Sequence, residues 1–209
     1  TALTNIITNR KDGKDLYVTN GGKITADVII DASGSLSHVA RLRGGHQGDD
    51  QVPTIYAQVS GEIPASFDIF LGAIAPMGYA WIIPKGEGFA NVGIGVKAGA
   101  MKGVLKEHLK KLCDELDLTI HSWGGGWIPM GGPVKNLVKD NVLAVGDAGG
   151  LVMPSNGGGI SQAIISGFYA GEAVIQHFNS GMELQSYHRR TMNVMKKSLK
   201  TSLRTKKIA

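Results

Sequence analysis

The stretch AVGDAGGLVMPSNGGGISQAI, from Ala144 to Ile164, decides how the rest of the chain is interpreted. The apolar run NVLAVGD at its start predicts a buried strand with Asp147 at the carboxyl end. A helix is predicted from Ile160 to about His177, so the glycines at 157–159 lie at its N-terminus. Glycines let backbone N–H groups approach a ligand closely, and a helix N-terminus carries partial positive charge. The pattern therefore predicts a binding site for an electron-rich group.

Two kinds of ligand suit this site, and one interpretation needs no ligand. A pyrophosphate fits the N-terminus of a helix, and so does the N1–C2=O edge of a reduced flavin, while Asp147 could accept hydrogen bonds from ribityl or sugar hydroxyls. The alternative is a glycine-rich turn in which Asn156 caps the helix. Ala163, Gly167 and Gly171 recur every four residues, which predicts that this helix packs very close to a sheet.

A second strand ends in an acid near the start of the chain. Residues 2–31 are expected to form a β-meander with turns at KDGK and NGGK, and its third run, Ala26 to Asp31, is apolar enough to be buried on both faces. A short helix is expected in SLSHVARLRGG. Ligands bind beyond the carboxyl ends of parallel strands, so Asp31 could face the same ligand as Asp147. Asp31 could equally be a simple turn residue.

Between the two acids the pattern changes to antiparallel sheet. Strand-like runs punctuated by Gly, Pro and Asn extend over 51–96, and a helix is expected over 101–117, followed by a Gly/Pro/Trp loop, WGGGWIPMGGP. GIGVKA, from Gly93 to Ala98, matches G-x-G-x-x-A, but its acids would fall inside the following helix, so we interpret it as strand packing. In YAWIIPKGEGFANVGIGV, Tyr79 and Trp81 share one face of a strand, either as core or as the lining of an apolar cavity.

These patterns predict an α/β (α+β) fold. It combines part of a Rossmann-like parallel sheet, a β-meander and an inserted antiparallel sheet. We expect four regions, 1–44, 45–123, 124–180 and a basic C-terminal helix in 181–209.

Composition limits the functional classes. No apolar run is long enough to cross a membrane, and the single cysteine, Cys113, favours a cytoplasmic setting. The six histidines show no metal-binding spacing, and Ser35, Ser37 and His38 lack the context of a hydrolase triad. The segment from Leu184 to Ala209 contains eight of the 22 lysines and arginines and no acid. It could be a packed helix with a solvated face, or it could lie on an anionic membrane surface; no motif supports nucleic-acid binding.

Taken together, the motifs DASG, NVLAVGDAGGLVMPSNGGGI and YAWIIPKGEGFANVGIGV resemble the geranylgeranyl reductase family, in particular the archaeal digeranylgeranylglycerophospholipid reductases. These are flavoproteins of the p-hydroxybenzoate-hydroxylase-like superfamily. The resemblance covers about Ile24 to Gly171 and implies FAD as cofactor, an isoprenoid lipid as substrate and a role in phospholipid biosynthesis. It implies cofactor contacts at Asp31, Gly34, Asp147, Ala148, Gly149, Asn156, Gly157, Gly158, Gly159 and Ile160. The substrate contacts that it implies are at Tyr79, Trp81, Pro84 and Lys85.

The expected activity is therefore saturation of prenyl double bonds by hydride transfer from reduced flavin. The chemistry belongs to the cofactor, and the protein supplies orientation and a dry channel. We expect a cytoplasmic protein that can lie on the inner face of the membrane. The chain departs from the family in that the G-x-G-x-x-G unit and the cysteine-bearing segment of the N-terminal half are not in it. It is expected to be the middle and latter part of a reductase, with an aromatic monooxygenase or halogenase, or a non-catalytic chain, as alternatives.

Overall fold

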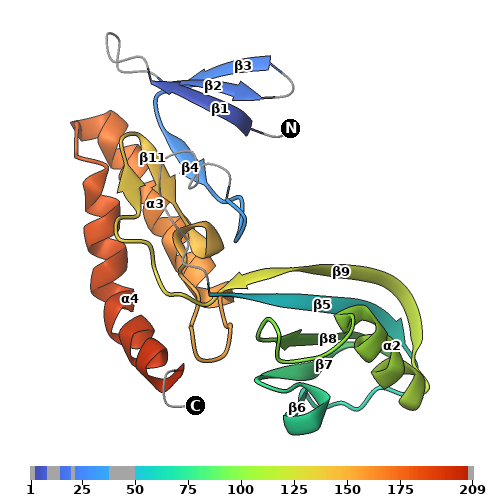
Figure 1. The fold of residues 1–209 in the computed structure, drawn as a ribbon. Coiled ribbons are helices and arrows are strands. Elements are labelled where there is room, and N and C mark those ends of the chain that lie inside the picture. The colour runs from blue at the N-terminus through green and yellow to red at the C-terminus, as the bar shows by residue number, and fades with distance from the viewer. Residues whose placement is uncertain (1–2, 9–14, 20–21, 38–49, 207–209) are drawn as a thin grey trace. The chain divides into compact units, whose positions relative to one another are not determined.

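The structure is a computed structural model that describes residues 3–8, 15–19, 22–37 and 50–206 (Figure 1). The chain divides into two compact units. The first unit combines residues 1–50 with 129–209, and the second comprises residues 51–128. The second unit is thus an insertion in the sequence of the first.

The first unit contains two small sheets. One is an antiparallel meander of β1 (Leu3–Thr8), β2 (Asp15–Thr19) and β3 (Gly22–Ala26). The other has the order β10-β11-β4, formed by Val138–Lys139, Val142–Ala144 and Ile29–Asp31. Strands β4 and β11 are parallel, and Asp31 pairs with Ala144. The carboxyl ends of the two acid-bearing segments therefore lie side by side, as the sequence predicted.

The strand predicted over 26–31 is divided in the structure, so that part of the prediction is wrong. The meander ends at Ala26, where the Asn141 side chain donates hydrogen bonds to the backbone oxygens of Ala26 and Asp27, at 3.3 and 3.0 Å. The Ile29 N–H then donates to the Asn141 carbonyl at 2.9 Å, which starts β4 in the second sheet. Ile30 is 43% exposed, so β4 is not buried on both faces. Most of the helix expected in SLSHVARLRGG lies outside the described residues.

Two long helices follow the parallel pair. Helix α3 (Ile160–Ser180) and helix α4 (Gln185–Lys206) lie side by side and share a core with β10 and β11. Both helices begin within a residue of where the sequence places them. The close packing predicted from the interval of four in α3 is seen at Ala163, which lies against Gly146, but a methyl group added at Gly167 or Gly171 would meet no described atom within 4 Å. Ser166, Ala170 and Ala173 form its buried face instead.

The end of α4 contacts the two segments that connect the units. The ammonium group of Lys206 pairs with the Asp50 carboxylate and donates to the Met130 carbonyl at 3.0 Å. The Met130 N–H in turn donates to the Asp50 carbonyl at 2.9 Å. The point where the chain leaves the first unit is therefore joined to the point where it returns.

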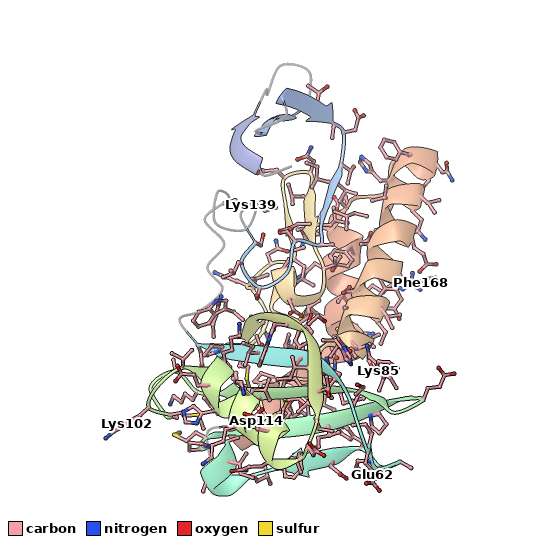
Figure 2. All side chains as sticks on the ribbon, turned by 90° about the vertical axis from the view of Figure 1, so that its right-hand side faces the viewer. Glu62, Lys85, Lys102, Asp114, Lys139 and Phe168 are labelled. Carbon is pink, nitrogen blue, oxygen red and sulfur yellow. The ribbon has the colours of Figure 1, made fainter. Side chains whose placement is uncertain are left out.

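The second unit is a five-stranded sheet of order β6-β7-β8-β5-β9. Its strands are β5 (Gln51–Ser60), β6 (Asp68–Phe70), β7 (Gly78–Gly86), β8 (Phe89–Val96) and β9 (Thr119–Pro129), with a short turn of 3-10 helix, η1, at Gly72–Ile74. Helix α2 (Leu105–Glu115) packs on one face through Leu109, Leu112 and Cys113. In Figure 2, Lys102 and Asp114 are labelled on the segment that contains this helix.

The glycine-rich segment that was interpreted as a loop, from Trp123 to Pro129, is part of β9. Its glycines are needed because the neighbouring strand lies against them. A Cβ at Gly124 would lie 2.3 Å from the Tyr56 ring, and one at Gly125 would lie 2.7 Å from the Thr54 carbonyl oxygen. Here glycine marks close approach between strands. GIGVKA follows the expected pattern, since it forms the end of β8 and no helix begins at Ala98.

Among the described residues, no helix combines the length and apolar character that crossing a membrane requires.

Candidate functional site

Asp147 lies in a tight turn just beyond β11. The strand ends at Ala144 and the turn η2 covers Gly146–Gly149, so the acid is not on the strand itself as predicted. The strand stops because Gly146 adopts a left-handed backbone, with φ of 51°. A side chain at Gly146 would also press on Ala163 of α3, at 3.1 Å. Partial burial raises the pKa of the Asp147 carboxyl, because desolvation disfavours its charge.

Both helices hold this turn in place. The Gly146 N–H donates to Ser166 Oγ of α3 at 3.0 Å, and the buried Tyr187 hydroxyl of α4 donates to the Ala144 carbonyl at 2.6 Å. The Val145 N–H donates to the Asp31 carbonyl at 3.0 Å, which ties the turn to β4. The position of Asp147 is thus fixed by α3, α4 and β4 together.

The PSNGGG segment forms a compact loop that ends at the first turn of α3. The Asn156 side-chain oxygen accepts from the Gly158 N–H at 3.0 Å, and Met153 and Gly158 are joined by a backbone hydrogen bond of 2.8 Å. The helix N-cap is Gly159, and no side chain caps it. The interpretation of Asn156 as the helix cap is therefore wrong, because the N-cap is Gly159 and it makes no side-chain cap hydrogen bond.

Asp147 and the glycine loop are brought together. A methyl group at Gly159 would lie 3.3 Å from an Asp147 carboxylate oxygen, so the carboxylate lies directly against the backbone at the start of α3. Gly157 has φ of 72°, a conformation that favours glycine. Exposed Ile160 follows at the helix start. The two features that the sequence assigned to one site are neighbours in space.

The remaining predicted cofactor residues have structural tasks. Ala148 is fully buried, and the carbonyl of buried Gly149 accepts from the Val134 N–H at 3.0 Å, so both pack beneath the turn. Asp31 is 3% exposed, and its carboxylate accepts from the Ser33 and Ser37 hydroxyls at 2.6 and 2.5 Å. Asp31 therefore shapes the DASG turn, where Gly34 has φ of 80°. Direct contact of these residues with a cofactor stays a prediction.

The second candidate site is the face of the inserted sheet opposite α2. Strand register places Trp81 of β7 and Tyr56 of β5 on either side of Gly93 in β8. Residues directly opposite on neighbouring strands project from the same face. Tyr79 and Trp81 have ring centroids 5.7 Å apart, and desolvation raises the pKa of Tyr79. The result is an aromatic surface in which Trp81 is half-buried and Tyr56 is 38% exposed.

The other two predicted substrate residues, Pro84 and Lys85, are placed differently from Tyr79 and Trp81. Pro84 pairs with buried Ala90 and lies two residues after Ile82, so it shares the face of the core-facing Ala80 and Ile82, on the α2 side of the sheet. Lys85, labelled in Figure 2, is exposed where the β7–β8 register shifts.

Sequence reasoning missed Tyr56 and Asn91 as members of the aromatic surface. Asn91 accepts a hydrogen bond from the Trp81 indole N–H at 2.7 Å. Strict alternation around Ala57, Val59, Ala90 and Val92 was the signal that could have found both.

Among the described residues, no cluster of His, Cys, Asp and Glu could hold a metal ion.

Residues 53–124 match the family model of the geranylgeranyl reductase catalytic domain. The chain is also 36% identical over 186 residues to digeranylgeranylglycerophospholipid reductase 2 of Methanosphaera stadtmanae, covering 84% of this chain and 46% of the relative. It is 33% identical over 198 residues to the corresponding reductase 2 of Methanothermobacter thermautotrophicus, covering 89% of this chain and 51% of the relative. The chain is homologous to geranylgeranyl reductases. It spans about half the length of the curated relatives it matches.

Solved structures agree with this relationship. A geranylgeranyl bacteriochlorophyll reductase-like protein of Thermoplasma acidophilum superimposes with a TM-score of 0.84 at 25% identity, covering 98% of this chain and 56% of that chain. The flavin-dependent halogenase CmlS shares the fold at 15% identity, with a TM-score of 0.68 and coverage of 96% and 40%. The geranylgeranyl reductase fold expected from the sequence is confirmed.

Proposed function

We propose that this chain is part of an FAD-dependent reductase that saturates prenyl double bonds of isoprenoid membrane lipids. The observation that supports it best is the placement of the Asp147 carboxylate against Gly159 at the uncapped N-terminus of α3. The Asp147 carboxylate, which accepts hydrogen bonds, therefore lies next to the start of α3, where backbone N–H groups can donate them. A ligand that has both hydroxyl and carbonyl groups requires such an arrangement. The curated relatives named as digeranylgeranylglycerophospholipid reductases support the choice of reaction.

FAD fits the residues present. Asp147 would accept hydrogen bonds from the ribityl hydroxyls, and the backbone of Gly157, Gly158 and Gly159, which carries no Cβ, would lie next to the flat edge of the ring. Reduced FAD supplies hydride for a carbon–carbon double bond when it is bound. The chain's own contribution is to hold the cofactor and to offer the partial positive end of α3 to negative charge. In the second unit, Tyr79, Trp81 and Tyr56 would orient an apolar chain.

The test has a binding arm and a reaction arm. FAD is added to the chain, excess is removed by desalting, and the retained flavin spectrum is compared between wild type, Asp147→Ala and the control Asp114→Ala. Asp114 is a suitable control because it pairs with Lys110 on the exposed side of α2. We expect retention to fall only in Asp147→Ala. Equal retention in all three proteins would contradict the assignment of Asp147.

In the reaction arm, the protein with chemically reduced FAD is incubated with a geranylgeranyl glycerophospholipid, and products are analysed by mass spectrometry. A gain of one H₂ per saturated bond is expected. Lipid that stays unsaturated would contradict the proposed reaction, and oxygen-dependent turnover of a small aromatic compound would indicate a monooxygenase or halogenase instead.

We also propose that α4 brings the protein to an anionic membrane surface. Lys196, Lys197, Lys200 and Arg204 are exposed and have no ion-pair partner among the described residues. Val194, next to Lys197 on the helix surface, is 51% exposed. Each basic residue near such a surface contributes about 1 kcal/mol. The expected substrate is itself a phospholipid, so enzyme and substrate would meet at the bilayer.

Vesicle sedimentation tests the membrane proposal. Wild type should bind vesicles that contain phosphatidylglycerol and not vesicles of phosphatidylcholine alone. Replacing Lys196, Lys197 and Lys200 by Gln should abolish binding, whereas the same change at Lys97, Lys102 and Lys111 should not. If both triple variants bind equally, α4 is not the membrane-binding surface.

A further inference from the structure

The indole of Trp81 lies flat on the sheet instead of standing up from it. Gly93 of β8 pairs directly with Trp81 of β7. A Cβ built on Gly93 would lie 2.1 Å from Cζ2 and 2.4 Å from Cε2 of the indole. The ring therefore rests on the bare backbone of β8, in space that any other residue would fill.

Asn91 fixes the direction in which the indole lies. It is two residues before Gly93 on the same strand, and so it projects from the same face. Its Oδ1 accepts the indole N–H at 2.7 Å. A tryptophan N–H can only donate, so a single acceptor placed at its edge selects one orientation of the ring.

Tyr56 repeats part of this arrangement one strand pair away. Its ring lies over Gly124 of β9, where a Cβ would be 2.3 Å from Cζ. Two aromatic rings are thus laid on glycine backbone on the face of the sheet opposite α2. Among the described residues, no side chain holds the Tyr56 hydroxyl as Asn91 holds the indole, so Trp81 is the ring with a directional restraint.

We propose that Asn91 is the positioning residue of the substrate surface: it holds the Trp81 indole flat over Gly93 so that a prenyl chain meets a fixed apolar plane. This inference rests on the proposed function for the identity of the substrate. Asn91 acts through Trp81 and need not touch the substrate itself. A prenyl chain is flexible, and binding it against a preorganised surface avoids ordering the surface at the same time.

The first arm of the test measures the indole without any substrate. Trp123 and Trp127 are replaced by Phe, so that Trp81 is the single tryptophan in the chain. We expect time-resolved anisotropy to show a mobile indole in Asn91→Leu and a rigid one in Asn91→Asp, because the carboxylate oxygen can accept the same hydrogen bond. Gln58→Leu is the control, since Gln58 pairs with Asn91 across β5 and β8. Equal anisotropy decays in Asn91→Leu and wild type would overturn the inference.

The second arm measures reduction of the prenyl lipid. Loss of one such hydrogen bond should raise KM about fivefold in Asn91→Leu while kcat changes less than about twofold. Asn91→Asp should restore the wild-type KM. In a Trp81→Phe background, which has no N–H to hold, Asn91→Leu should have no further effect on KM. An equal increase in that background would overturn the positioning role, and so would an unchanged KM in Asn91→Leu.

The two arms separate the two proposals. An indole that loosens in Asn91→Leu, in a protein that reduces no prenyl lipid, contradicts the proposed function and leaves the positioning of Trp81 standing. If Asn91→Leu does not fold, Asn91→Ser provides the second variant, because its shorter side chain cannot reach the indole from the same backbone position.

Discussion

Replacing Gly93 by Ala should destabilise the second unit, and its cost can be worked out from the structure. The added methyl would lie 2.1 Å from the Trp81 ring, well inside the 3.0 Å that real Cβ atoms respect. The indole must lift, which is an overpacking cost of about 1–3 kcal/mol. It also loses its bond to Asn91, about 1 kcal/mol. Replacing glycine lowers the entropy of the unfolded chain and returns about 0.5–1 kcal/mol. The expected net loss in the free energy of unfolding is about 1–3.5 kcal/mol.

Urea denaturation followed by tryptophan fluorescence measures this loss. All three tryptophans, Trp81, Trp123 and Trp127, lie in residues 51–128, so the signal reports on the second unit. With a slope of about 2 kcal/mol/M, the midpoint should fall by about 0.5–1.8 M. Gly126→Ala is the matched control, because a Cβ there meets no described atom within 4 Å. It should change stability by less than about 0.5 kcal/mol.

A double variant decides whether the ring is the cause. In a Trp81→Ala background the methyl at position 93 has no indole to displace, so Gly93→Ala should be close to neutral. If Gly93→Ala is as stable as wild type, or if it costs the same with and without Trp81, the steric reasoning is refuted.

Three further predictions concern single residues. Burial raises the pKa of the Asp147 carboxyl, so its ionisation at neutral pH opposes folding. Asp147→Asn should therefore raise the melting temperature at pH 7. Calorimetry across pH should show this gain vanish as the pH falls and Asp147 becomes protonated in the wild type. Tyr187→Phe removes the bond to the Ala144 carbonyl and should cost about 1–2 kcal/mol of unfolding free energy by chemical denaturation, with weaker FAD retention because the Asp147 turn loosens. Cys113 is buried, and the pKa of its thiol is raised mainly by desolvation and to a smaller extent by the nearby Asp114 charge. A thiol reagent should therefore react with Cys113 only in denaturant. Rapid reaction of the folded protein would contradict the packing described.

The sequence was most informative where a pattern was long and periodic. Helices α3 and α4 followed from apolar runs and their spacing, and so did the adjacent carboxyl ends of the strands at Asp31 and Asp147, although the run 26–31 is divided between two sheets. The proximity of Asp147 to Gly159 also followed from the sequence, because a strand, a glycine loop and a helix can join in few ways. The resemblance to geranylgeranyl reductases supplied the expected chemistry.

Glycine was the residue that local reasoning misinterpreted most often. At Gly124 and Gly125 the local signal indicates a loop, but the residues form a strand because Tyr56 and Thr54 occupy the space of a side chain. At Gly167 and Gly171 the spacing indicates close packing, but a Cβ there would meet no described atom within 4 Å. A glycine records that a side chain is not tolerated or not needed, and only its neighbours in space distinguish the two.

The joined ends of the insertion have a practical consequence. Asp50 and Met130 are linked by a backbone hydrogen bond, and Lys206 binds both, so the two ends of the inserted segment are only one hydrogen bond apart. A module with adjacent ends can be exchanged between homologues or excised, with little strain at the junction. Chimaeras that swap residues 51–128 between relatives would therefore exchange the inserted sheet and its aromatic surface as one unit, leaving the Asp147 turn untouched.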